Sequence, residues 1–157
     1  MSTFRRGVRL GIDVGRARVG VARCDPDGML AVPVETVPRD EASIARILQI
    51  ASEYDPLEFV VGLPVNMQGA DTASTTDARE FAAELCRRSG TPVRLVDERL
   101  STVTAHAALR SSGRSQKKSR SIVDQVAAVV LLQQAIDMEK STGNPAGAII
   151  SPDEEHA

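Results

Sequence analysis

Asp13 stands at the end of an apolar, strand-like segment, in Gly11-Ile-Asp-Val-Gly15. Alternation puts Gly11 on the same strand face, and if a second strand pairs so that Gly20 and Ala22 share that face, the surface around the carboxylate is bare. A bare surface beside a carboxylate lets a metal ion and a phosphate backbone approach closely. The segment also fits a structural turn, in which Gly15 supplies unusual dihedral angles and Asp13 hydrogen-bonds the backbone. The turn is the commoner use of such a segment.

A second acidic segment, Asp97-Glu98-Arg99, follows a short apolar run. Adjacent residues of a strand point in opposite directions, so only one of the two acids is expected to face a site beside the first strand. Arg99 would then neutralise a phosphate or orient a carboxylate. Helix capping is the alternative, with Ser101 or Thr102 as N-cap and the acids favourable near the helix N-terminus. Capping explains the Ser and Thr but not three consecutive charges beside an apolar strand.

A third acid, Asp124, lies near the start of a long apolar segment. Ser121-Ile-Val-Asp124 fits the S/T-x-x-D/E pattern of a capping box before a hydrophobic run. The small residues Ala127 and Ala128 follow one turn later and leave space for the carboxylate to reach across to a sheet. Taken alone, capping is the more common role.

Candidate nucleic-acid contacts lie between these acids. From residue 99 to residue 123 the chain has six basic residues and no acid, so this segment carries +6 and the rest of the chain −8, for a net charge of −2. A basic patch on an acidic body is typical of a phosphate-binding face, although a solvated loop explains it equally well. The candidates in this segment are Arg99, Arg114, Lys117 and Lys118. Asn66 is another, in a loop that follows a buried strand, where binding groups tend to sit.

Composition narrows the class of protein. A chain of 157 residues with 42% hydrophobic and 25% charged residues predicts one globular domain. Aromatic residues make up only 3%, so base-stacking platforms are scarce. Cys24 and Cys86 are far apart, which argues against a zinc site or a disulfide framework and favours a reducing, cytoplasmic compartment. No signal peptide and no membrane span is expected.

The elements that position these residues follow a simple order. Alternation predicts strands over residues 8–14, 19–24 and 30–37, which form an antiparallel meander. Short apolar runs predict further strands over 58–63 and 93–96, and hydrophobic spacing predicts helices around 44–51, 78–85, 101–110 and 121–138. Asp40 is expected to cap the first helix and Gly90 to close the second. A mobile loop is expected over 112–120.

This order predicts an α/β fold in which one mixed sheet, with an antiparallel three-strand meander and parallel strands, is flanked by helices. One domain is expected over residues 1–140, followed by a flexible tail over 141–157.

Four blocks of the sequence together resemble the YqgF family, also called RuvX, of bacterial Holliday junction resolvases and ribosomal RNA processing nucleases. The blocks are GIDVGRARVGVA (11–22), VVGLPVNMQG (60–69), DERLST (97–102) and DQVAAVVLLQ (124–133). They come in the family's order and cover most of the chain. Cys24, Gln68 and Ala70 depart from the residues that the family often has, which weakens any detailed assignment to the 66–70 loop but leaves the acids untouched.

The resemblance implies a ribonuclease H-like fold and a catalytic carboxylate cluster of Asp13, Glu98 and Asp124 that binds Mg²⁺ or Mn²⁺. It favours Glu98 over Asp97, a choice that the residues alone leave open. Hard divalent ions prefer carboxylate oxygens and can activate water for phosphodiester hydrolysis, so the chemistry agrees with the resemblance. Clustered carboxylates are costly without a metal, so metal is expected to stabilise the fold.

Three functions are compared. The first is a metal-dependent nuclease acting on the 5′ end of the 16S ribosomal RNA precursor or on branched DNA junctions; RNA is preferred because the family's general role is described that way, and junction cleavage would favour a homodimer. The second is an actin-like ATPase or sugar kinase, which shares the GxDxG pattern but needs a second lobe and a second phosphate loop. The third is a nucleic-acid-binding module without catalysis, which would not need the three acids.

Overall fold

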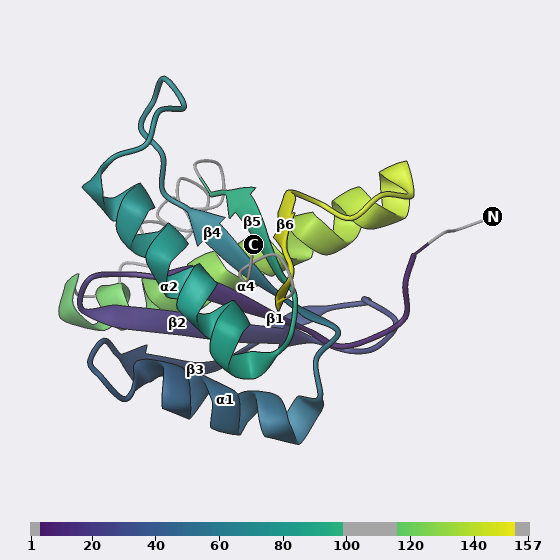
Figure 1. Cartoon of the computed structure of the whole chain (residues 1–157), viewed down its shortest axis with the longest axis horizontal. Coiled ribbons are helices and arrows are strands. Elements are labelled where there is room, and N and C mark those ends of the chain that lie inside the picture. The colour runs from purple at the N-terminus through teal and green to yellow at the C-terminus, as the bar shows by residue number, and fades with distance from the viewer. Residues whose placement is uncertain (1–3, 99–115, 153–157) are drawn as a thin grey trace.

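The computed structural model describes residues 4–98 and 116–152, and for residues 116–124 the backbone only. A six-stranded sheet in the order β3-β2-β1-β4-β5-β6 forms its centre (Figure 1). The strands β1, β2 and β3 are antiparallel neighbours, β1, β4 and β5 are parallel, and β6 is antiparallel to β5. The strands are β1 (Arg9–Val14), β2 (Arg18–Cys24), β3 (Ala31–Pro38), β4 (Glu58–Leu63), β5 (Val93–Asp97) and β6 (Ala148–Ile150). The predicted mixed sheet with an antiparallel meander is therefore confirmed.

Helices cover both faces of the sheet (Figure 1). They are α1 (Ser43–Tyr54), α2 (Ala73–Ser89) and α4 (Gln116–Thr142). Alternation along β1 explains the two layers, because Leu10, Ile12 and Val14 pack into one buried core with α1 and α2. The opposite face carries Gly11 and Asp13 and lies under α4, whose Leu131 and Leu132 belong to a second core.

The ends of the first two helices only partly match the prediction. Gly90 closes α2 in the left-handed conformation, as expected. Asp40 is not the cap of α1, which begins after Ala42 without a side-chain cap. The Asp40 carboxylate instead accepts a hydrogen bond from the Ala42 backbone amide at 2.8 Å, and so it organises the turn before the helix.

α4 begins earlier than predicted. Residues 116–120 are its first turn rather than part of a mobile loop, so Lys117 and Lys118 lie on a helix. Ser121 and Asp124 are inside this helix, and a capping box requires its first residue to lie outside the helix. The capping interpretation of Asp124 is therefore wrong. The helix predicted over 101–110 lies outside the described residues.

The end of the chain adds an unexpected strand. α4 continues to Thr142, and Ala148–Ile150 pair with β5 as the edge strand β6, within the segment expected to be a tail. Three residues with two isoleucines are too short to show alternation, which explains why the sequence pattern did not indicate a strand. The division into a domain over 1–140 and a tail stays a prediction.

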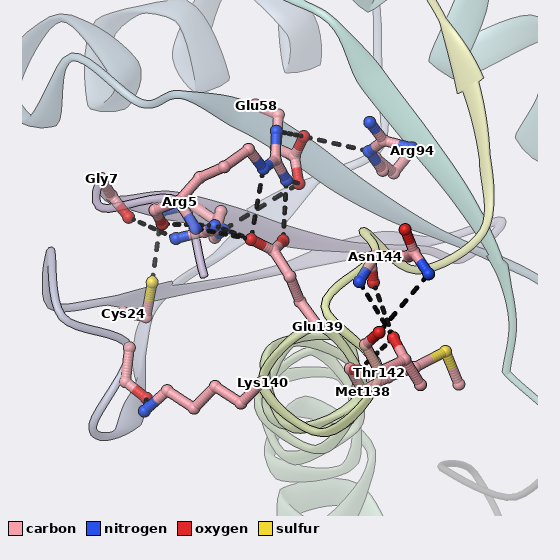
Figure 2. Close-up of polar contacts among 12 residues, drawn as sticks. Arg5, Gly7, Cys24, Glu58, Arg94, Met138, Glu139, Lys140, Thr142 and Asn144 are labelled. Atoms are coloured by element: carbon pink, nitrogen blue, oxygen red, sulfur yellow. Dashed lines mark hydrogen bonds and ion pairs between the residues drawn. The ribbon is translucent and has the colours of Figure 1, made fainter. Parts of the chain in front are cut away.

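A buried ion-pair network ties α4 to the start of the sheet (Figure 2). Glu139 of α4 accepts hydrogen bonds from Arg9 Nη2 at 3.1 Å and from Arg5 Nη2 at 2.8 Å. Glu58 of β4 accepts from Arg5 and from Arg94 of β5. Only 2% of Arg9 and of Glu139 is exposed, so each charge depends on its partners. The network fixes the position of α4 along β1.

Within residues 4–98 and 116–152, no helix is both long and apolar enough to cross a membrane.

Candidate active site

The pairing of β1 with β2 places a glycine directly beside Asp13. Asp13 lies opposite Gly20, and Gly11 lies opposite Ala22, which is the register that the sequence suggested. A Cβ on Gly11 would lie 2.9 Å from the carbonyl oxygen of Ala128. α4 therefore rests directly on β1 at Gly11, and the half-buried Asp13 lies two residues further toward the end of the strand.

Glu98 reaches the same sheet face from β5. Its backbone amide donates to the Leu63 carbonyl at 3.3 Å, and its carboxylate lies over Gly62 of β4. Gly62 shares its strand face with Val60, which packs against α4. Glu98 is 8% exposed, whereas the preceding Asp97 is exposed. Of the two adjacent acids, Glu98 is thus the one turned toward the face that carries Asp13.

The register of the parallel strands brings these positions to one edge. Gly11 of β1 lies opposite Val60 of β4. Asp13 and Gly62 are each two residues further along, so the same register, if continued, sets them side by side. Because the Glu98 carboxylate lies over Gly62, it lies in the row next to Asp13. Both acids lie at the carboxyl ends of their strands, the usual edge for binding groups in parallel sheets.

The backbone of Asp124 approaches this edge because α4 runs antiparallel to β1. Glu139 lies by Arg9 at the start of β1, and Ala128 lies over Gly11. One helical turn before Ala128 is Asp124, about 6 Å along the helix. Asp13 is a similar distance beyond Gly11, about 7 Å along the strand. The helix thus brings residue 124 toward the end of β1 that carries Asp13.

A hydrogen bond next to Asp124 supports this placement. Gln125 Nε2 donates to Thr36 Oγ1 at 2.7 Å. Thr36 of β3 lies opposite Gly20, which in turn lies opposite Asp13. This part of α4 therefore crosses the sheet at the row of Asp13.

The predicted metal-ligand set is only partly described by the structure. Among the side chains that the structure describes, no group of three acidic, histidine or cysteine residues could hold a metal ion. The side chain of Asp124 lies outside the described residues, so the structure brings together two of the three predicted ligands, Asp13 and Glu98. The complete cluster stays a prediction.

An ion pair that the sequence did not indicate holds the turn after Asp13. Arg39 donates to both carboxylate oxygens of Asp77 at 2.8 Å and to the Gly15 carbonyl at 3.0 Å, and its backbone amide donates to the Ala17 carbonyl. The hydrogen bonds with Asp77 raise the pKa of Arg39, and the same bonds lower the pKa of Asp77. No local pattern identifies such a pair, because its members are 38 residues apart.

Comparison with known proteins shows the family of the chain. Residues 7–138 match the model of a family described as "RuvX: Holliday junction resolvase". The chain belongs to the RuvX family. A relative from Clavibacter michiganensis subsp. michiganensis, named as a candidate pre-16S rRNA nuclease, is 54% identical over 150 residues, covering 94% of this chain and 93% of the relative. A relative of the same name from Streptomyces coelicolor is 52% identical over 147 residues, covering 92% and 88%.

The fold also has a counterpart among solved structures. RuvC of Thermus thermophilus in complex with a Holliday junction substrate matches with a TM-score of 0.56 and 18% identity, covering 89% of this RuvX chain and 99% of that chain. At this identity the match concerns the fold alone. The predicted RuvX family, ribonuclease H-like fold and nuclease class are confirmed.

The predicted nucleic-acid contacts are only partly visible in this RuvX protein. Arg99 and Arg114 lie outside the described residues, and of Lys117 and Lys118 only the helical backbone is described. Asn66 has a structural part: its Oδ1 accepts hydrogen bonds from the backbone amides of residues 68 and 70, at 3.0 and 2.9 Å. The binding role of all five residues stays a prediction.

Proposed function

We propose that this RuvX protein is a metal-dependent endonuclease that hydrolyses a phosphodiester bond at the 5′ end of the 16S ribosomal RNA precursor. The observation that carries the proposal is that Asp13 and Glu98 lie on one glycine-lined face at the carboxyl edge of the sheet. The names of the relatives favour the RNA substrate. The description of the family favours branched DNA as the alternative. Action on ribosomal RNA would place the protein in the cytoplasm.

The chemistry of the residues at this edge fits a divalent cation. Asp13 and Glu98 provide carboxylate oxygens, and Gly20, which lies opposite Asp13, adds no side chain of its own beside them. In this proposal Asp13, Glu98 and Asp124 hold Mg²⁺ or Mn²⁺. A bound cation of this kind supplies Lewis-acid activation of water and stabilises negative charge on the reacting phosphate.

The chain itself has two further tasks in this proposal. Gly20, directly opposite Asp13, would let a phosphate backbone approach that carboxylate at close range, whereas Gly62 makes room for the Glu98 carboxylate itself. The surrounding contacts hold the two carboxylates in place: Arg39 fixes the turn after Asp13, and the Leu63 carbonyl holds the backbone of Glu98. Such fixed geometry is what positions a reacting group effectively.

Cleavage assays test the proposal directly. Purified protein is incubated with labelled precursor ribosomal RNA fragments and with four-way DNA junctions, each with Mg²⁺, Mn²⁺ or EDTA, beside the Asp13→Asn variant. We expect metal-dependent cutting of the RNA that is lost in the variant. Preferred cutting of the junction would transfer the function to the DNA alternative, and a measurement of the oligomeric state would then show whether two sites act together. Tight binding without cutting under all conditions would overturn the catalytic proposal and favour a binding module.

A further inference from the structure

The loop between β4 and α2 projects from the sheet at the edge that carries the two acids (Figure 1). It begins directly after Gly62 and Leu63, the residues that contact Glu98. The side chains of this loop would therefore lie next to a substrate strand that reaches the two carboxylates.

The loop is held in one shape by its own hydrogen bonds. Besides the two bonds to its side-chain oxygen, Asn66 donates its backbone amide to the Ala70 carbonyl at 3.0 Å and accepts at its carbonyl from Gly69 at 2.9 Å. Gly69 adopts a φ of 81°, which glycine tolerates best. At the base, Thr75 Oγ1 donates to the Pro64 carbonyl at 2.7 Å and fixes the loop to α2. A loop organised in this way pays little conformational entropy when it binds.

Met67 lies in the turn of this loop and is largely exposed. Its exposed fraction of 85% is the highest among the large hydrophobic residues that the structure describes as exposed. The loop residues 64–70 carry no charge, so they do not repel a polyanion. The loop thus presents a large apolar side chain beside the proposed nuclease site. Such a side chain can bind an apolar surface of the substrate there.

We propose that Met67 is an apolar wedge that inserts between two neighbouring bases of the substrate strand beside the scissile phosphate; this inference rests on the proposed nuclease function. Bases are the apolar part of a nucleic acid, and methionine is among the side chains that proteins insert between base steps. The flexible thioether adapts to different base steps, so insertion tolerates sequence while responding to unstacked or distorted structure. Met67 would thus position the strand and favour structured substrates.

Fluorescence of 2-aminopurine tests the insertion apart from cleavage. The base is placed at successive positions around the cleavage site of the precursor RNA and around the crossover of the DNA junction, where its fluorescence rises when it is unstacked. Binding is measured with the Asp13→Asn variant, which is not expected to cut. The comparison adds Met67→Ala or Met67→Gln to this variant. Met29→Ala is the matched control, because Met29 is 72% exposed but lies in the β2–β3 connection at the opposite end of the sheet.

We expect a fluorescence rise at one base step that is lost with Met67→Ala and Met67→Gln and kept with Met29→Ala. In the otherwise unchanged protein, Met67→Ala should raise KM or lower kcat/KM for the structured substrate by about tenfold, with an unchanged melting temperature. If the protein cuts but neither fluorescence nor kinetics depends on Met67, or if it binds neither substrate, the wedge is overturned. A Met67-dependent signal without any cutting would keep the wedge and overturn the nuclease proposal. Loss of self-association, instead of a fluorescence change, would show that this loop contacts a second copy.

Discussion

The carboxylate of Glu98 occupies the space above Gly62 that any other residue would fill with its own side chain. A Cβ on Gly62 would collide with Glu98 Oε2 and lie 3.0 Å from Cδ and 3.1 Å from Cβ of Glu98. Gly62 is not among the glycines with a positive φ, so its backbone conformation suits any residue. The glycine is required by the acid above it and not by the strand.

Gly62→Ala should therefore displace Glu98 and lower kcat by about a hundredfold, as expected when a reacting group moves by about 1 Å. The melting temperature should fall slightly, because the collision strains the buried carboxylate. The double variant Gly62→Ala/Glu98→Ala is the control: removing the glutamate relieves the collision, so stability should recover while activity does not. Full activity of Gly62→Ala would contradict a catalytic position for Glu98 above this glycine.

Two neighbouring acids offer a sharper comparison, since Glu98 is buried and Asp97 is exposed. Glu98→Gln keeps the size of the side chain and removes its charge, so metal-dependent cleavage should fall on the order of a thousandfold or more. Asp97→Asn should retain activity within a few-fold, because its side chain points away from the site face. Rates under saturating Mg²⁺ and Mn²⁺ measure both variants, and the reverse order of effects would make Asp97 the ligand.

The sequence predicted the core of this arrangement because its signals are local. Alternation placed Asp13 on one strand face, and the pairing that the sequence offered as a condition, with Gly20 and Ala22 on that face, is the one observed. The choice of Glu98 over Asp97 came from the resemblance; the structure buries Glu98 and exposes Asp97, and the ligand role of Glu98 stays a prediction.

What the sequence missed depends on contacts between distant residues. The Arg39–Asp77 pair joins the end of β3 to α2, and Glu139 meets Arg9 130 residues away, so neither has a local pattern. The early start of α4 was missed for another reason. Residues 116–120 are polar and basic without apolar spacing, so hydrophobic periodicity does not mark them as helical.

The Arg39–Asp77 pair should matter more for activity than for stability. Both side chains are partly exposed, so Asp77→Ala is expected to cost about 1 kcal/mol of folding free energy or less. Loss of Asp77 frees Arg39 to leave the Gly15 carbonyl, so the turn after Asp13 loosens and kcat should fall about tenfold.

Asp71→Ala is the control for this pair, because Asp71, just before α2, forms an exposed ion pair at 3.0 Å with Arg79 of α2, the helix that also carries Asp77. Within the described part of the chain this second pair does not contact the turn after Asp13, so the variant should keep its activity. Equal kinetics of the Asp71 and Asp77 variants would show that the Arg39 contact with Gly15 does not position Asp13.

Metal should stabilise the folded protein through the proposed ligands. Carboxylates that share one site repel each other without a cation, and a ligand that binds only the folded state raises its stability. Mg²⁺ or Mn²⁺ at about one hundred times its Kd should add about 2.7 kcal/mol, measured as a rise in melting temperature. Asp13→Asn should melt higher than the wild type in EDTA and respond less to metal. An equal response of both proteins would place the stabilising cation elsewhere.

The buried network around Glu139 should make stability depend on pH. Burial by itself raises the pKa of Glu139, but the hydrogen bonds from Arg5 and the charges of Arg9 and Arg5 outweigh it and leave the pKa below its ordinary value. The folded state therefore binds fewer protons than the unfolded state in this range. The stabilisation is complete above the ordinary glutamate pKa of about 4.3 and is lost as the pH falls through the lower pKa of the folded state.

Glu139→Gln tests this dependence, because it leaves Arg9 buried beside a neutral amide. The variant should lose about 3–5 kcal/mol of unfolding free energy at neutral pH. The gap between wild type and variant should narrow as the pH falls below about 4. Glu80→Gln, on the exposed surface of α2, is the control and should leave both the stability and its pH profile unchanged. Urea unfolding at a series of pH values measures the gap, and a constant gap down to pH 3 would mean that Glu139 binds protons equally in the folded and unfolded states, so that folding does not lower its pKa.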